Sequence, residues 1–409
     1  MTKAEPIPAA TADQSPKPFR RQVFYIPGYD PIHPRRYREL YRKEGATQAA
    51  LSGYALALQP KKTAGRYGWH VTTDGAEADV EVLVWSDIVR SSMQQGILAT
   101  YLQLVRTAAA YVGTGALFRL MRLRKGPMIA ALYPIGMLLL QLALALAAGF
   151  GVYRLGALVH PAPALVVALA VTVLILRAFQ ANDNRLYAHY LMHDYAFTAQ
   201  GLGANPPELE TRMQAFRATI AATLTRDFDE VLIVGHSSGA HLAVSILADL
   251  IRDGLPEQRP ALGFLSLGQV VPMISFLPRA NRLRADLRFL SAQDSVTWVD
   301  VTAPGDGCAF ALCDPVAVTG VAPPDQKWPL ILSAAFTQTL SPARWKSLRW
   351  RFFRLHFQYL CAFDALSGGP GDYDYFQITA GPLTLHQRYE ARAPSPGRIT
   401  TPRSGHRST

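Results

Sequence analysis

Residues 231–243 read VLIVGHSSGAHLA, and this stretch decides the fold of the chain. Four apolar residues come first, as in a buried strand, and Leu242, Ile246 and Leu250 then recur at helical spacing. Between strand and helix lies the pattern Gly-x-Ser-x-Gly, with Ser237 at its centre. Glycines on either side of a serine allow a tight turn because they carry no Cβ atom. The stretch therefore predicts a strand, a sharp turn that presents the Ser237 hydroxyl, and a helix whose N-terminus lies beneath it.

This strand, turn and helix resemble the nucleophile elbow of the α/β-hydrolase superfamily, in particular its lipase- and esterase-like members. The resemblance covers roughly residues 20–90 and 205–385 and leaves out the middle of the chain. It implies an α/β fold with a mostly parallel sheet flanked by helices. It also implies a serine hydrolase that cleaves an acyl ester through a Ser-His-Asp triad, without a metal ion or an organic cofactor. An acyltransferase that uses the same serine, and a non-catalytic membrane scaffold that keeps the fold, are the alternatives.

An early apolar run at residues 22–26 ends in the turn Pro-Gly-Tyr-Asp-Pro. In the hydrolases a loop after an early strand supplies one backbone N–H to the oxyanion hole. The resemblance makes the N–H of Tyr29 one candidate donor and the N–H of Ser238 the second. A plain Pro-Gly turn is the alternative. A helix is predicted over residues 34–50, and strands over 54–58, 69–72 and 80–85.

Two further strands are predicted at residues 262–268 and 298–302. The resemblance places the triad acid on the loop after the second of these strands, where Asp306 stands between two glycines. Asp314 is the rival, because lipase-like relatives often carry its Asp-Pro-Val sequence at the acid. Position relative to the strand end favours Asp306, which is the predicted acid. Asp300 falls within the strand and is predicted to be structural.

The order of this fold, serine then acid then histidine, leaves His356, His386 and His406 as candidate bases. His406 belongs to a tail predicted to be disordered. His356 resembles the His-x-x-Tyr ending of some lipase-like relatives and is the predicted base. His386 has the same spacing to Tyr389 and follows a strand-like run at residues 375–379, so it stays open as the alternative.

The middle of the chain is too apolar for an ordinary part of such a domain. Residues 127–153 contain no charge and no histidine, and in residues 155–176 His160 alone is ionisable. About 20 apolar residues suffice for a helix to cross a bilayer. Two such runs joined by a short turn predict a transmembrane helical hairpin, inserted between strands of the sheet at residues 119–180.

Basic residues flank the hairpin unevenly. Four precede it, two follow it and one lies in its turn: Arg119, Arg122, Arg124 and Lys125, then Arg177 and Arg185, and Arg154. Cytoplasmic flanks carry the excess of Lys and Arg. The pattern predicts an integral membrane protein, of the bacterial inner-membrane type, whose catalytic domain faces the cytoplasm. A lipid, an acyl ester or an acyl thioester would then reach the site through the membrane.

Composition narrows the remaining possibilities. The net charge of +11 is spread over several segments, and no aromatic-interleaved basic motif occurs, so no nucleic-acid partner is expected. Three cysteines predict neither a disulfide framework nor a zinc site. The predicted organisation is therefore a disordered N-terminus, a hydrolase domain in two parts around the hairpin, and a disordered basic tail. Their bounds are 1–19, 20–118, 119–180, 181–387 and 388–409.

Overall fold

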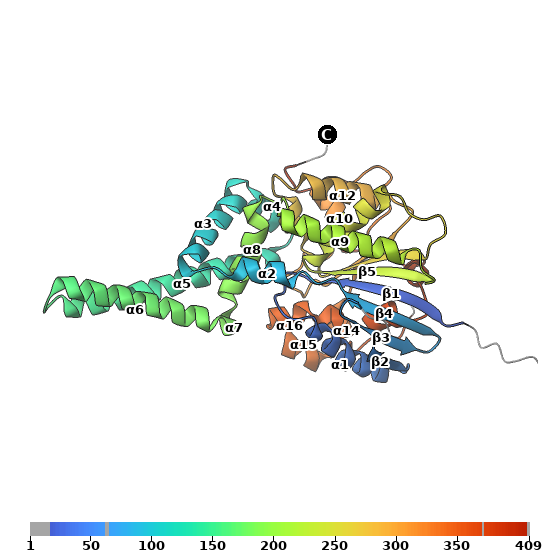
Figure 1. Cartoon of the computed structure of the whole chain (residues 1–409), viewed down its shortest axis with the longest axis horizontal. Coiled ribbons are helices and arrows are strands. Elements are labelled where there is room, and N and C mark those ends of the chain that lie inside the picture. Colours follow the sequence, from blue (N-terminus) through green and yellow to red (C-terminus); the bar gives the residue numbers. More distant parts are fainter. Residues whose placement is uncertain (1–16, 62–64, 370–371, 407–409) are drawn as a thin grey trace, which may run out of the picture.

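The computed structural model describes residues 17–61, 65–369 and 372–406, so the predicted disordered N-terminus lies almost entirely outside the described residues. The fold is α/β, around a mostly parallel sheet in the order β2-β3-β4-β1-β5-β6-β7-β8 (Figure 1). Strand β3 runs opposite to the other seven strands, so its pairs with β2 and β4 are antiparallel and the remaining pairs are parallel. The strands are β1 Phe19–Ile26, β2 Leu56–Pro60, β3 Gly68–Thr73, β4 Ala76–Val82, β5 Glu230–His236, β6 Ala261–Leu267, β7 Thr297–Thr302 and β8 Leu330–Ser333.

Helices cover both faces of this sheet because successive strand side chains point to opposite sides. In β5, Val231 and Ile233 join one core and Leu232 and Val234 join the other. The first core packs against α2 Ser86–Met93, α3 Ile97–Gly113, α4 Ala116–Met121, α8 Ala188–Gln200, α9 Pro207–Thr223, α10 Gly239–Arg252, α11 Val271–Ser275, α12 Asn281–Ser291 and α13 Pro315–Thr319. The second packs against α1 Arg35–Ser52, α14 Phe336–Thr339, α15 Pro342–Leu348, α16 Phe352–His356, η1 Gln358–Leu360, α17 Tyr375–Ala380 and α18 Leu385–Tyr389.

The strand-like run at residues 375–379 is a helix, α17, so that prediction is wrong. The side chain of Asp374 accepts hydrogen bonds from the N–H groups of Phe376 and Gln377 and so caps the first turn. Such a cap stabilises a helix by about 1 kcal/mol, which outweighs the weak strand preference of the aromatic and β-branched residues that follow.

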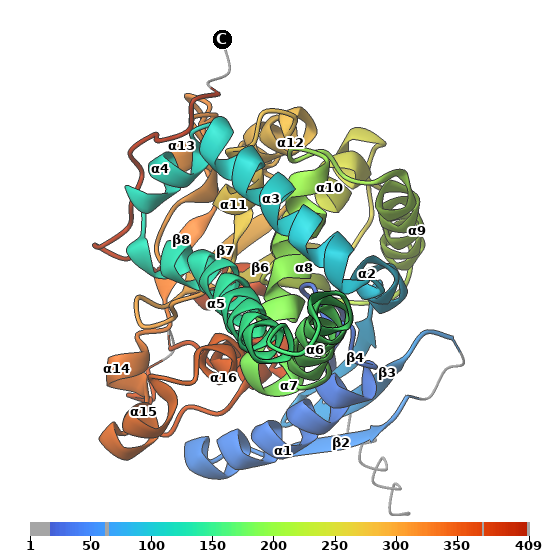
Figure 2. The same ribbon diagram turned by 90° about the vertical axis from the view of Figure 1, so that its left-hand side faces the viewer.

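Two long apolar helices, α5 Lys125–Gly156 and α6 Pro161–Ala181, form a hairpin that projects from the body (Figures 1 and 2). Both are long and apolar enough to cross a membrane. The first part of α5 belongs to the body, where Leu138 packs with Leu104 of α3 and Met192 of α8. We call the remainder, residues 139–181, the apolar hairpin. The short helix α7 Asp183–Leu186 then leads into α8.

Small residues hold the two helices of the apolar hairpin together. A Cβ atom on Gly149 would lie 2.2 Å from Oγ1 of Thr172, and one on Gly156 would lie 2.9 Å from Cβ of Ala164. Thr172 in turn donates a hydrogen bond to the carbonyl of Ala168, 2.9 Å away. Close backbone approach through small residues is typical of helices that pack in lipid.

The basic tail is ordered over residues 388–406, contrary to the prediction of disorder. Ile399 donates to the carbonyl of Leu312 at 2.7 Å and accepts from the N–H of Asp314 at 3.0 Å. Further along, Arg403 donates to the carbonyl of Val318 at 2.9 Å. These backbone pairs, together with the side chain of Ile399, which packs against the first core, fix a segment that is otherwise poor in apolar residues.

Candidate functional site

The turn after β5 holds Ser237 in a backbone conformation that few side chains adopt. Its φ angle is +56°, in the left-handed region. The two glycines of the motif make this possible, since a Cβ on Gly239 would lie 2.1 Å from the carbonyl oxygen of Ile26. A Cβ on Gly235 would lie 2.8 Å from Cα of Ala240. The predicted strand, sharp turn and helix are therefore present, with Ser237 at the N-terminus of α10.

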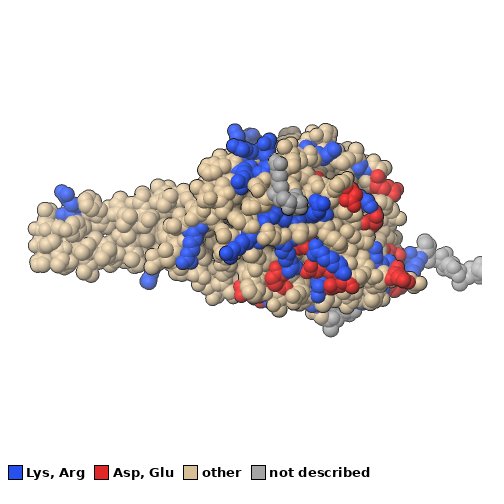
Figure 3. All heavy atoms as spheres, turned by 90° about the horizontal axis from the view of Figure 1, so that it is seen from above, with Lys and Arg blue, Asp and Glu red and all other residues tan. Residues whose placement is uncertain are grey.

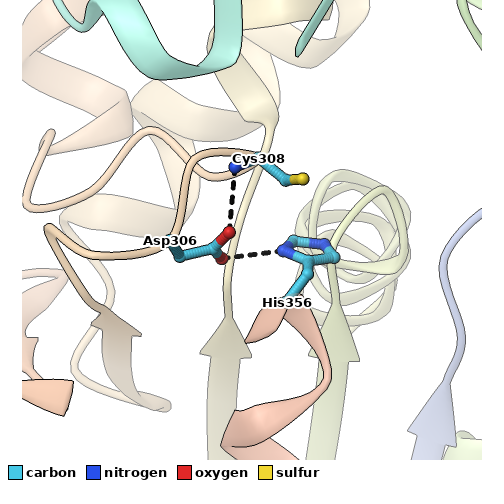
Figure 4. A group of neighbouring side chains, drawn as sticks. All are labelled: Asp306, Cys308 and His356. Atoms are coloured by element: carbon cyan, nitrogen blue, oxygen red, sulfur yellow. Dashed lines mark hydrogen bonds and ion pairs between the residues drawn. The ribbon is translucent and has the colours of Figure 1, made fainter. Parts of the chain in front are cut away.

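Asp306 and His356 form the central hydrogen bond of the site. His356 Nδ1 lies 2.7 Å from Asp306 Oδ2, and both side chains are buried (Figure 4). The N–H of Cys308 donates to the other carboxylate oxygen at 2.9 Å, and the hydroxyl of Tyr359 donates to Oδ2 at 3.0 Å. Burial raises the pKa of Asp306, but the nearby His356 ring and these hydrogen bonds together hold the pKa below its usual value. The carboxylate is thus kept ionised and fixes the orientation of the imidazole.

Ser237 and His356 line one cavity at the carboxyl ends of the central strands. The cavity has a volume of about 90 Å³. Its walls come from the loop after β1, from α3, α8, α11 and α16, and from Pro127 at the start of α5. Within the described part of the chain, neither Ser237 Oγ nor His356 Nε2 makes a hydrogen bond. The hydroxyl and the free ring nitrogen therefore both remain available to a bound molecule.

The two predicted oxyanion donors differ in availability. The N–H of Tyr29 donates to the side-chain oxygen of Ser238 at 3.1 Å, so it is not the free donor that the sequence predicted. The Ser238 hydroxyl accepts this hydrogen bond because the loop after β1 passes directly over the turn, where Gly28 approaches Ser237. The N–H of Ser238 has no hydrogen-bond partner among the residues described and points from the start of α10.

The alternative acid, Asp314, and the alternative base, His386, lie outside this cavity. Asp314 caps α13, accepting from the N–H groups of Val316 and Ala317, and also accepts from Gln326. His386 is exposed on α18, 3.8 Å from Glu390. Geometry therefore brings together Asp306 and His356 and leaves both alternatives outside the cavity.

Two residues outside the predicted triad contact this arrangement: His236, predicted to pack or to bond the backbone, and Asp194, to which the sequence assigns no role. His236 donates from Nε2 to the backbone carbonyl of His356 at 3.0 Å and so fixes the backbone of that residue. Burial, followed by the nearby His356, lowers the pKa of His236 to about 3, which keeps the ring neutral. Asp194 of α8 lines the same cavity, and burial raises its pKa to about 7. Only the tertiary structure places a residue of α8, which follows the apolar hairpin, beside Ser237.

Asp306, Cys308 and His356 are also a group whose ligand atoms lie within 4.8 Å of one another, close enough for a metal ion to be considered (Figure 4). Burial raises the pKa of the Cys308 thiol well above its usual value, and thiolate is the form that binds metals. Asp306 and His356 already satisfy each other by hydrogen bonding. The group therefore fits an acid–base pair better than a metal centre.

No family model, curated protein or solved structure matches this chain. Function is accordingly inferred from the residues of the cavity and their geometry.

Proposed function

We propose that this protein is a membrane-anchored serine hydrolase of the α/β-hydrolase type that cleaves an acyl ester. One observation carries the proposal: a serine held at positive φ by flanking glycines shares a cavity with a histidine that is hydrogen-bonded to a buried carboxylate. Backbone strain at a cavity-lining nucleophile is typical of functional sites. Serine, histidine and aspartate in these roles are the components of acyl transfer through a covalent intermediate.

In this mechanism His356 takes the proton of Ser237 through Nε2 as the hydroxyl oxygen attacks the acyl carbonyl. Asp306 keeps the proton of the ring on Nδ1 and stabilises the imidazolium that forms. His356 then gives the proton to the leaving alcohol, and water later releases the acyl group by the same steps. The serine and the ring are not hydrogen-bonded in the free protein. Such bonds are often long before substrate binds.

The oxyanion that develops during attack needs donors at the turn. The N–H of Ser238 is unpartnered and lies at the N-terminus of α10, where the helix dipole favours negative charge. The N–H of Tyr29 becomes the second donor if the substrate oxygen displaces the hydroxyl of Ser238. Each such donor lowers the activation barrier by about 3–4 kcal/mol in acyl-transfer enzymes.

The apolar hairpin supports the membrane part of the proposal. Its outward side chains are large and apolar; Leu140, Phe150 and Val166 are 51%, 62% and 67% exposed. On the face that Figure 3 shows, Lys and Arg lie only at the far end of the hairpin and toward the body. At 1.5 Å per residue, the 21 residues of α6 extend about 31 Å, the thickness of a bilayer core. We place the body on the side of the basic flanks, the cytoplasm, by the positive-inside rule.

A fluorophosphonate probe tests the catalytic part directly. The purified full chain in mild detergent is expected to be labelled, and Ser237→Ala is expected to remove the label. His356→Ala should slow labelling by a factor of about 100 or more, because general-base activation is lost. His386→Ala, which changes an exposed histidine, serves as the matched control and should label like the wild type. Equal labelling of wild type and Ser237→Ala would contradict the proposal and favour a non-catalytic scaffold.

A further inference from the structure

The cavity that holds Ser237 is acidic and aromatic, although the chain as a whole is strongly basic. Of the residues that line it, the charged ones are Asp30 and Asp194; no Lys or Arg belongs to this set. The net charge of the chain is +11. Aromatic rings form much of the wall: Tyr29, Tyr111, Tyr190, Tyr195, Phe353 and Phe357. A cavity of this composition disfavours an anion and suits a cation.

Asp30 is already neutralised within the protein. Its Oδ2 accepts from the hydroxyl of Tyr37 at 2.6 Å and lies 3.4 Å from Nη1 of Arg36. Its Oδ1 accepts from the N–H of Ile32 at 2.8 Å. Arg36 also stacks on Phe357, with its guanidinium carbon 4.5 Å from the ring centroid. Both oxygens of Asp30 are therefore already bonded within the protein.

Asp194 is in the opposite situation. In the described residues its carboxyl group makes neither a hydrogen bond nor an ion pair. Three of the nearby tyrosine hydroxyls bond other groups: that of Tyr29 bonds Ser92 Oγ at 2.5 Å, and that of Tyr111 donates to the carbonyl of Met273 at 3.1 Å. The hydroxyl of Tyr190 donates to the carbonyl of Tyr29. The His356 ring in the same cavity acts on the Asp194 carboxyl group electrostatically but makes no hydrogen bond to it. A carboxyl group in a largely aromatic cavity without a hydrogen-bond partner is costly unless a ligand supplies one.

We propose that the cavity recognises an ammonium group on the substrate, with Asp194 as the counter-ion and the surrounding aromatic rings as the cage. A quaternary ammonium is attracted to the faces of aromatic rings, and more strongly when it is desolvated; a carboxylate beside it adds to that attraction. Asp194 and Ser237 line the same small cavity, so the cationic group lies close to the acyl carbonyl. The substrate class is an ester that carries a quaternary or primary ammonium near the scissile bond. This inference rests on the proposed function and narrows its substrate.

A pair of isosteric esters tests the preference. Butyrylcholine carries a trimethylammonium group, and 3,3-dimethylbutyl butyrate carries a neutral tert-butyl group of the same shape. For the full-length wild type in detergent, kcat/KM is expected to be at least about ten-fold higher for the cationic ester. Asp194→Asn should reduce this ratio to within about three-fold, because it removes the charge and keeps the shape. Asp325→Asn, which removes the same charge from an exposed position, should leave the ratio unchanged.

Binding of phenyltrimethylammonium separates this inference from the proposed function. The ligand should raise the Tm of the wild type and of Ser237→Ala but not that of Asp194→Asn. If no ester is cleaved yet this pattern holds, the hydrolase proposal fails and the cation site stands. If esters are cleaved but the neutral one is preferred, or Asp194→Asn keeps the wild-type ratio, the ammonium site is wrong. Absence of a Tm shift in the wild type would likewise overturn it.

Discussion

At the level of single residues, the space left by the neighbouring backbone decides whether the turn at Ser237 can form. Ser237 adopts a φ of +56°, and the loop after β1 passes so close that Gly28 would place a Cβ 3.0 Å from the Cβ of Ser237. Strain of this kind costs about 1–3 kcal/mol and persists only where the surrounding structure enforces it. Because Gly235 and Gly239 carry no Cβ atom, the neighbouring backbone can pack closely against the turn.

Gly239→Ala is expected to lower the Tm by several degrees, because the added Cβ would meet the backbone oxygens of Ile26 and Pro27 at 2.1 and 2.7 Å. Backbone atoms cannot move aside cheaply, and overpacking of this kind costs about 1–3 kcal/mol. Thermal unfolding of the detergent-solubilised chain measures the effect. Gly113→Ala, where a Cβ meets nothing within 4 Å, is the matched control and should keep the Tm. Equal Tm values for the two variants would refute this account of the turn.

Asp194 is expected to make stability depend on pH. Burial raises its pKa to about 7 in the folded protein, whereas in the unfolded chain the carboxyl titrates near its ordinary value of about 4. Between these values the folded state binds more protons, so this group's contribution to stability falls as the pH rises from about 4 to about 7. The loss is at most about 4 kcal/mol, and less because the cavity admits solvent.

Asp194→Asn removes this dependence and should therefore raise the Tm more at pH 8 than at pH 4. Differential scanning fluorimetry of wild type and variant at the two pH values measures the difference. Asp325→Asn controls for the loss of one negative charge at an exposed position. A Tm gain of the same size at both pH values would show that the carboxyl is not perturbed by burial.

At the scale of secondary structure elements, the apolar hairpin is held by small residues rather than by an apolar core. Gly149 and Gly156 of α5 and Ala164 of α6 let the two backbones approach closely. Large side chains such as Phe150 and Leu174 point outward instead. In lipid, outward apolar side chains gain nothing from association, so close packing of small residues stabilises the pair.

Gly149→Leu should separate the helices of the apolar hairpin, because its Cβ would lie 2.2 Å from Thr172 Oγ1 and 2.9 Å from the carbonyl oxygen of Ala168. Gly151→Leu is the control, since nothing lies within 4 Å of a Cβ at that position. Limited proteolysis of the protein in vesicles should cleave the first variant faster within residues 154–163. If both variants are cut at the wild-type rate, the helices are not held by this contact.

At the scale of the whole molecule, the start of α5 belongs to the cavity wall and its far end lies beyond the body. Pro127 lines the cavity with Ser237, and the apolar hairpin then extends from the same helix (Figure 1). The proposed site therefore lies on the side of the body from which the apolar hairpin extends. An amphiphilic ester in the membrane could reach it without crossing bulk water.

Membrane topology is testable with single cysteines at the two ends of the molecule. Leu158→Cys lies in the turn of the apolar hairpin, where Leu158 is 83% exposed, and Glu257→Cys lies on the surface of the body. In right-side-out vesicles a membrane-impermeant maleimide should label the first and spare the second, each compared with the parent chain. Inside-out vesicles should give the opposite result. Labelling of both from one side would show that the apolar hairpin does not cross.

The sequence by itself determined the local elements. Residues 231–243 predicted the strand, the turn and the helix around Ser237, since apolar periodicity and glycine spacing act between neighbours in the chain. The two uncharged runs predicted a helical pair in the same way, and the structure confirms two helices of the expected length. The mostly parallel sheet flanked by helices is implied by the family resemblance of this stretch, and the structure has such a sheet.

Only the tertiary structure decided which distant groups meet. It joined Asp306 to His356, assigned Asp314 to a helix cap, left His386 in solvent and brought Asp194 from beyond the apolar hairpin into the cavity. It also ordered the basic tail through backbone pairs that composition does not reveal. The physical reason is the distance along the chain over which each kind of interaction acts. Local preferences are set by adjacent residues. Hydrogen bonds and burial at the cavity instead join segments up to 209 residues apart, and which segments meet depends on how the whole sheet packs.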